Sequence, residues 1–266
     1  MKRSIFNYIK IYFMMISQDF KSKMAYRADF IISTIAMILV NLAGFASFWL
    51  MFRSIPAIKG FDFDELLFMY GFAVLAACPF QILFDNLWQL WVHAMQGDFI
   101  KYCFRPINLF FYYVAETLDA KGIGQLIYGL VIFIYAWIKI GIPVTFASIA
   151  ILLISLVGAS LVLIGIMTLA SASAFITING ATFMVLFNDC REYAKYPTTI
   201  FNKFFRVIFT CVLPIGFISF YPSMYFIRPE QFSVISLISP VVGIVVFYIA
   251  YKLWMLGAVK YAGTGS

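Results

Sequence analysis

Long stretches without a charged residue alternate along this chain with short segments in which charged residues gather. A membrane-spanning helix needs about 20 apolar residues, and an ionised side chain near the bilayer centre costs about 2.5 to 3.5 kcal/mol. The pattern therefore predicts an all-α integral membrane protein in which each charge-free stretch is a candidate span. These stretches are residues 30–52, 66–84, 122–138, 140–188, 207–227 and 231–251.

The stretch 140–188 is about twice as long as one span requires, and Ser171 and Ser173 lie near its middle among alanines. We expect it to fold into two spans, which makes seven candidates. Seven crossings would separate the termini, yet both ends are basic, and basic flanks favour the cytoplasm. Six transmembrane helices with both termini cytoplasmic therefore fit better. The basic flanks are Lys2, Arg3, Lys10, Lys21, Lys23 and Arg27 at one end and Lys252 and Lys260 at the other.

Residues 207–227 are the weakest candidate, because Pro214, Gly216 and Pro222 interrupt helical hydrogen bonding. We predict that this stretch is a broken, re-entrant segment that does not cross the membrane. A competing topology stays open, in which it crosses and 140–188 is a single span. The length of the stretch 140–188 favours the first arrangement. The distribution of charge favours the second, because it would place four basic residues on the cytoplasmic side, namely Arg191, Lys195, Lys203 and Arg206.

Residues 1–29 mix aromatic and aliphatic side chains with six basic residues and two aspartates. This composition predicts an amphipathic helix that lies in the cytoplasmic membrane interface. A basic arm that binds nucleic acid is the alternative, but the interleaved apolar residues favour membrane lipid.

Composition supports the membrane interpretation, since 64% of the 266 residues are hydrophobic and only 12% are charged. A soluble domain carries about twice that charged fraction. The net charge of +7 is spread among apolar stretches, so it is explained by membrane orientation and indicates no nucleic-acid partner. Cys78, Cys103, Cys190 and Cys211 are far apart and form no CxxC motif, so neither a metal site nor a disulfide framework is predicted.

The sequence contains few residues that could form a catalytic site. His93 is the sole histidine, and Trp88 and Trp91 before it are typical of a membrane interface. The sequence contains no HExxH motif and no pair of carboxylates inside a candidate span. We therefore expect a protein that is not itself an enzyme.

Transport would leave polar groups inside the spans, and Asn41 and Asn179 are the two candidates for a substrate path. No GxxxxGK[ST] phosphate loop occurs in the sequence. If the protein transports with ATP, a separate chain must bind ATP and Mg, and this chain needs no cofactor of its own.

Three segments of the chain form an ordered pattern. The first runs Gly-Asp-Phe-Ile-Lys-Tyr-Cys-Phe-Arg-Pro from Gly97 to Pro106 and continues to Phe110. The second is residues 191–197, and the third comprises residues 213–215 with 221–222. Together they resemble the type-2 ABC exporter permeases, specifically their compact bacterial six-span subfamily. Their order and spacing carry the resemblance, which extends along nearly the whole chain as one permease domain, residues 1–266.

The resemblance implies a role for each segment. Residues 97–118 would form a coupling region whose helix docks on an ABC ATPase, with Phe99 and Tyr102 exposed. The second span would continue past Phe84 as one helix of roughly 30 residues from Asp64, projecting below the bilayer. The docking residues would be Gly97, Asp98, Phe99, Lys101, Tyr102, Arg105 and Pro106. The re-entrant outer segment, residues 194–228, would contain Pro197, Pro214, Tyr221 and Pro222.

The implied function is that of a transmembrane permease subunit in the bacterial cytoplasmic membrane. It would export a hydrophobic or amphipathic compound, such as a drug or antimicrobial, with ABC ATPase subunits and a second permease chain, identical or paralogous, as partners. The alternative from another class is an uncoupled channel or a scaffold subunit of a membrane complex.

Overall fold

The computed structural model describes residues 5–25, 27–54, 57–119, 121–177, 179–231 and 234–261. Within these ranges most of the chain is helical, and it contains no strand beyond one isolated bridge between Ile58 and Phe61. The prediction of an all-α membrane protein is confirmed.

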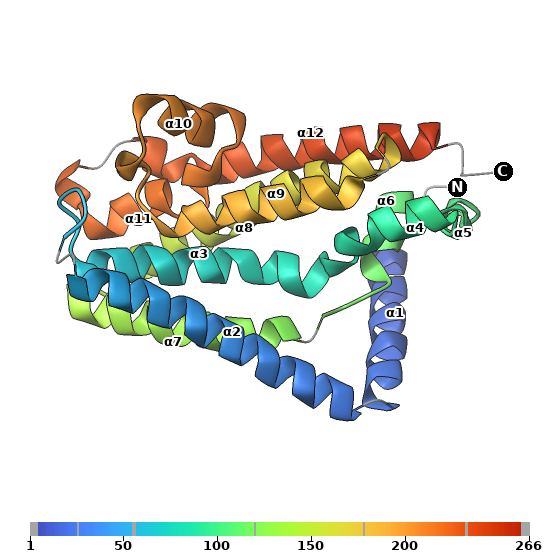
Figure 1. The fold of residues 1–266 in the computed structure, drawn as a ribbon, viewed down its shortest axis with the longest axis horizontal. Helices are drawn as coiled ribbons and strands as arrows, with labels where there is room; N and C mark the ends of the chain where they lie inside the picture. Colours follow the sequence, from blue (N-terminus) through green and yellow to red (C-terminus); the bar gives the residue numbers. More distant parts are fainter. Residues whose placement is uncertain are drawn as a thin grey trace.

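Five long helices form the body of the bundle, and each is long and apolar enough to cross a membrane. Figure 1 shows them lying lengthwise side by side, with α3 in the interior. The long helices are α2 (Arg27–Ser54), α3 (Phe63–Leu83), α7 (Lys121–Ile140), α8 (Phe146–Ala172) and α12 (Ser239–Lys260).

Glycines allow α8 and α12 to pack backbone against backbone. A Cβ atom added at Gly158 would lie 2.4 Å from the Pro240 nitrogen, and one at Gly243 would lie 2.4 Å from the Gly158 carbonyl oxygen. Helices in membranes associate through small residues of this kind, since lipid supplies no hydrophobic drive between them. The α8–α12 pair is therefore a rigid unit.

The stretch 140–188 divides, as predicted, beside the serines near its middle. Helix α8 ends at Ala172, a short 3₁₀ turn follows at Ser173–Phe175, and α9 (Gly180–Glu192) begins after it. Figure 1 shows α9 running back along α8 toward the end of the bundle away from the termini. Helix α9 has only 13 residues and is not among the helices long enough to cross a membrane, so the predicted count of six crossings stays a prediction.

Two short arms bent by 70° follow α9, Lys203–Val212 and Ile215–Ile227. They contain α10 (Lys203–Val207) and α11 (Phe220–Ile227) and stay at the end of the bundle opposite the termini (Figure 1). The predicted break at Pro214 is confirmed. Pro222, however, breaks nothing, because it lies in the first turn of α11, where helical N–H groups have no intrahelical partner.

The predicted long second helix is wrong, because α3 ends at Leu83 and Phe84 adopts φ −123°. A 3₁₀ turn (Asp85–Gln89) and α4 (Leu90–Gln96) follow. The physical reason is tertiary: the buried Asn86 side chain donates a 2.6 Å hydrogen bond to the Tyr113 carbonyl, which holds the chain in the bend.

The predicted limits of the last span, 231–251, are also wrong. Helix α12 begins at Ser239, where Pro240 occupies a first-turn position, and it continues to Lys260. Lys252 therefore belongs to the helix. Its ammonium lies 5.5 Å from the centre of the Tyr248 ring on the exposed face, as expected of a lysine that snorkels to the interface.

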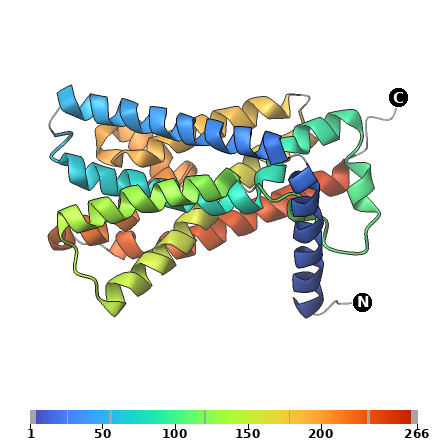
Figure 2. The ribbon, with the colours of Figure 1, turned by 90° about the horizontal axis from the view of Figure 1, so that it is seen from below.

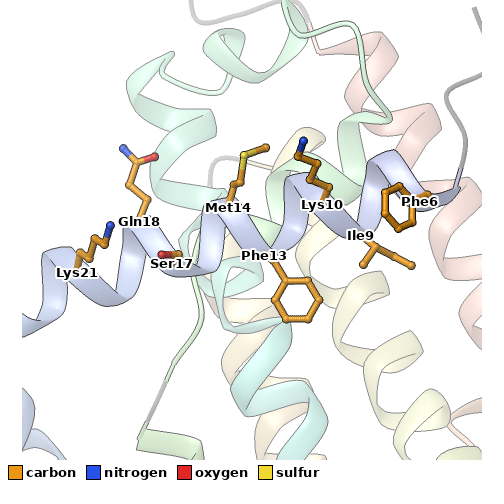
Figure 3. Close-up of a pocket in the computed structure, with 8 residues that line it drawn as sticks. All are labelled: Phe6, Ile9, Lys10, Phe13, Met14, Ser17, Gln18 and Lys21. Carbon is orange, nitrogen blue, oxygen red and sulfur yellow. The ribbon is translucent and has the colours of Figure 1, made fainter.

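Helix α1 (Ile5–Ala25) lies crosswise to the bundle in both views (Figures 1 and 2). Figure 3 shows Phe13 and Ile9 on a different side of the helix from Lys10. Residues 1–4 and 26 of the predicted interfacial helix 1–29 lie outside the described residues. The α1 end is held to the bundle by Asp19, which pairs with Lys23 at 2.8 Å and accepts the Leu118 N–H at 3.2 Å.

Candidate functional site

The segment between α4 and α6 (Leu109–Ala115) folds as a compact excursion at the end that holds the termini (Figure 1). Gly97 ends α4 with φ +80°, a backbone conformation that glycine adopts without strain. One helical turn, α5 (Ile100–Cys103), follows. Pro106 starts no helix, because Asn108 is the N-cap of α6 and its side chain accepts the Phe111 N–H at 2.9 Å.

The expected exposure of Phe99 and Tyr102 is wrong, since their side chains are 0% and 1% exposed. The Phe99 ring centroid lies 5.0 Å from that of Phe175 and 5.9 Å from that of Trp254. The Tyr102 ring lies 4.8 Å from that of Tyr113. These side chains anchor the excursion to the bundle and cannot contact another protein. We call Phe99, Tyr102, Tyr113, Phe175, Trp254 and Tyr261 the aromatic cluster.

Hydrogen bonds orient the polar groups of this cluster. The Tyr113 hydroxyl donates to the Asn86 carbonyl at 3.0 Å, so its contact of 3.1 Å with His93 makes Nδ1–H of the imidazole the donor. The Tyr102 hydroxyl donates to the Glu116 carboxylate. Burial raises the pKa of both tyrosines, and desolvation, followed by the charge of Lys101, lowers the pKa of His93. The histidine is therefore a neutral structural group.

The opposite face of the excursion is open to solvent. Phe104 is 79% exposed, although its side chain is large and apolar, and Arg105 beside it lies 5.8 Å from the Tyr112 ring. Sequence reasoning missed Phe104. Helical spacing could have revealed it, because residues three or four apart share one face of a helix. Phe99 and Tyr102, three apart, lie on the buried face. Ile100 and Phe104, four apart, lie on the exposed face. We call Asp98, Ile100, Lys101, Phe104, Arg105 and Pro106, all exposed, the crest.

The outer-segment residues form a compact unit at the far end of the bundle. The Tyr221 hydroxyl lies 2.8 Å from Thr210 Oγ1, and a Cβ atom at Gly216 would meet both the Tyr221 ring and Thr198 within 2.9 Å. Pro197 is the residue before the 3₁₀ turn Thr198–Ile200. That this unit lies at the outer face of a membrane stays a prediction.

A polar cavity of about 330 Å³ lies between α2, α3, α7 and α9. Asn41, one of the two predicted substrate-path residues, lines this cavity. Asn179 does not, because it is exposed in the turn before α9, so its expected place inside a span is wrong. The other polar lining residues include Gln81, Gln125, Asn188, Arg191 and Lys195.

Residues 36–265 match the family model of the ABC-2 family transporter protein. The chain belongs to the ABC-2 transporter family. This permease is accordingly the multi-pass membrane subunit of an ABC transporter, and it associates with ABC ATPase subunits. No curated protein and no solved structure matches the permease.

Proposed function

We propose that this permease exports a hydrophobic or amphipathic compound, such as a drug or an antimicrobial, across the bacterial cytoplasmic membrane. ATP and Mg would be bound by partner ABC ATPase subunits, and this chain would carry no catalytic group of its own. The crest would dock on the ATPase. The observation that carries the proposal is the exposed Phe104 in the excursion between α4 and α6.

The crest has the composition of a docking surface. Specific interfaces combine a buried apolar centre, in which aromatic and arginine side chains contribute most, with a polar rim. Phe104 and Ile100 would form the apolar centre, and Asp98, Lys101 and Arg105 would form the rim.

The aromatic cluster connects the crest to the spans. Phe99 lies directly behind the crest and contacts Trp254 of α12, which in turn packs closely against α8 along the glycine interface. Because packed interiors transmit displacement, a movement of the docked ATPase would shift α12 and α8 together. This is how ATP hydrolysis on another chain would change the exposure of the substrate path.

A second permease chain, identical or paralogous, would pack along α2 and α9. Helix α2 exposes a row of large apolar side chains along its length, which include Ile35, Leu39, Leu42 and Leu50. Membrane lipid would cover what the second chain leaves free. In this arrangement the crest and both termini are cytoplasmic, and α10 and α11 lie at the outer face.

Copurification tests the proposal. The tagged permease, expressed with the ABC ATPase subunits of its host, is purified in mild detergent beside the double variant Phe104→Asp with Arg105→Glu. We expect wild type to copurify with an ATPase. The amount of ATPase bound to the variant should be at least about tenfold lower, since interface hot spots contribute about 2 kcal/mol or more. The matched control is Phe204→Asp with Arg206→Glu, which makes the same changes on exposed residues of α10.

Three outcomes separate the alternatives. Loss of the ATPase in the crest variant alone supports docking at the crest. Equal loss in both variants, or retention in both, assigns docking elsewhere. A folded wild-type permease that copurifies with no ATPase would favour the channel or scaffold function instead.

A further inference from the structure

We propose that the polar cavity between α2, α3, α7 and α9 binds the anionic group of an amphipathic molecule that carries one acidic group, carboxylate or phosphate, on an apolar body. The proposal that an anion binds here is argued from the geometry and charge of the cavity alone. The proposal that this molecule is the exported compound rests on the proposed export function.

The position of the cavity in the bundle is the first argument. It extends along α3 from Tyr70 to Gln81, which is about 16 Å at 1.5 Å per residue. Asn41 lies at the middle of the apolar span Ile31–Phe52, whereas Gln125 lies near the start of the span Gly122–Ile140 and Arg191 lies near the end of α9. A polar side chain at the depth of Asn41 is costly, and in membrane proteins such a side chain marks a binding site or pathway.

Charge is the second argument. Arg191 Nη2 lies 3.7 Å from a Glu192 carboxylate oxygen, and Lys195 pairs with the other oxygen of the same carboxylate. The side chains of Arg191 and Lys195 are largely buried, with exposures of 19% and 22%. One carboxylate cannot neutralise two cations, so this end of the cavity retains one positive charge for a ligand.

The two ends of the cavity differ in charge. Gln81, near the end of α3 that faces the crest, donates to Asp85 at 3.1 Å and to Asp119 at 3.3 Å. Carboxylates thus lie beyond one end of the cavity, and Arg191 and Lys195 line the other together with the single carboxylate of Glu192. An anionic group is repelled from the crest end and attracted toward α9.

Asn41 supplies a hydrogen-bond donor for the ligand. Its backbone carbonyl accepts the Tyr128 hydroxyl at 3.1 Å, but its side-chain Nδ2 is buried and has no hydrogen-bond partner among the described residues. A buried donor without an acceptor costs about 1 to 3 kcal/mol. An acceptor oxygen of a ligand in the cavity would satisfy it.

Size limits what enters. A volume of about 330 Å³ is at the lower limit of ligand pockets, so the cavity holds a headgroup and leaves a long apolar body outside. Met37 and Val40 of α2 line the cavity beside Asn41, and α2 exposes large apolar side chains along its length. The apolar body would lie on this face, which makes the ligand an amphiphile.

Native mass spectrometry of the purified permease tests the site without any ATPase. The probe is lauroyl lysophosphatidic acid, and monolauroylglycerol is the neutral control with the same chain. We expect one tight adduct with the phosphate probe, at a Kd at least about tenfold below that of the neutral probe, since hydrogen bonds to charged groups contribute about 1.5 to 3 kcal/mol.

Three variants locate the adduct. Arg191→Gln should weaken it about tenfold or more, Arg191→Lys should restore most of the binding, and Asn41→Leu should weaken it several-fold. The control Arg206→Gln removes an equal charge outside the cavity and should change nothing. Adducts of equal strength for both probes, or a Kd that Arg191→Gln and Asn41→Leu leave unchanged, would overturn the proposal.

A second arm distinguishes cargo from resident lipid. The permease is reconstituted with its ATPase in phosphatidylcholine vesicles, and ATP-dependent movement of labelled lysophosphatidic acid between leaflets is measured. Movement that Arg191→Gln abolishes and Arg206→Gln preserves identifies the anionic amphiphile as cargo. Binding without movement assigns the site to a bound lipid and contradicts the cargo assignment, while the export function itself stands or falls with the copurification test.

Discussion

Arg228 holds Glu65 with two hydrogen bonds, from Nε at 2.9 Å and from Nη2 at 2.8 Å. Glu65 also accepts the backbone N–H of Asp62 at 3.0 Å, as the third residue of the capping box that begins α3. The guanidinium lies 4.1 Å from the centre of the Phe61 ring. The Glu65 carboxylate thus caps the start of α3 and also binds Arg228, the last residue of the outer segment, to this helix end.

Replacement of Glu65 should therefore loosen this end of the bundle. We expect Glu65→Gln to lower the free energy of unfolding by about 1.5 to 3 kcal/mol, because hydrogen bonds to charged groups contribute that much. Arg228→Lys keeps the charge but loses the two-pronged geometry, so it should also destabilise. Thermal unfolding in detergent measures both. Glu230→Gln, on an exposed residue nearby, is the control, and equal melting temperatures for all variants would contradict the assignment.

Two phenylalanines in the excursion should respond oppositely to the same change. Phe99→Ala empties a fully buried site and should cost about 3 to 5 kcal/mol of stability. Phe104→Ala alters an exposed side chain and should change stability by less than about 0.5 kcal/mol while it weakens ATPase binding. Unfolding curves and copurification together check the pair. A Phe104→Ala protein as unstable as Phe99→Ala would show that the crest is a packing surface.

His93 should make stability depend on pH. Its pKa is lowered from 6.5, first by burial and then by Lys101, so the folded permease binds fewer protons than the unfolded chain as the pH falls through 6.5. The contribution of His93 to the free energy of unfolding is fully present above pH 6.5, and it is lost as the pH falls toward the lower pKa of the folded state. Nearby Glu116 and Asp98 oppose the shift.

The comparison is between wild type and His93→Gln from pH 7.5 to 5.5. All carboxylates are common to both proteins, so a difference between their melting curves reports His93. We expect wild type to lose more stability toward pH 5.5 than the variant does. Parallel curves would mean that protonation of this ring is not coupled to folding.

Labelling distinguishes the two topologies. Cys103 is exposed in the excursion, and Lys203 is exposed in α10 at the opposite end of the bundle. In a background with the other cysteines changed to serine, a membrane-impermeant maleimide should reach Lys203→Cys on intact cells and Cys103 only after permeabilisation. Labelling of Cys103 alone on intact cells would reverse the orientation, and protection of both would support the topology with residues 207–227 as a span.

The hydropathy pattern was enough to predict the fold class, the positions of the five long helices and the breaks beside Ser173 and at Pro214. These features follow from local rules, since bilayer thickness sets the length of a span and proline removes a helical hydrogen bond wherever it stands. The end of α3 at Leu83 was not predictable in this way, because it depends on Asn86 and its partner Tyr113, 27 residues away.

The candidate sites were decided only by tertiary packing. Phe99 and Phe104 are the same residue type in one short segment, and what buries the first is Trp254, which the chain brings from α12. Asn41, Gln125 and Arg191 each look like isolated polar residues in the sequence, yet three helices place them around one cavity. Hydropathy measures the transfer of each residue into lipid by itself, whereas a site depends on which side chains from distant segments meet, and that is determined by how the helices pack.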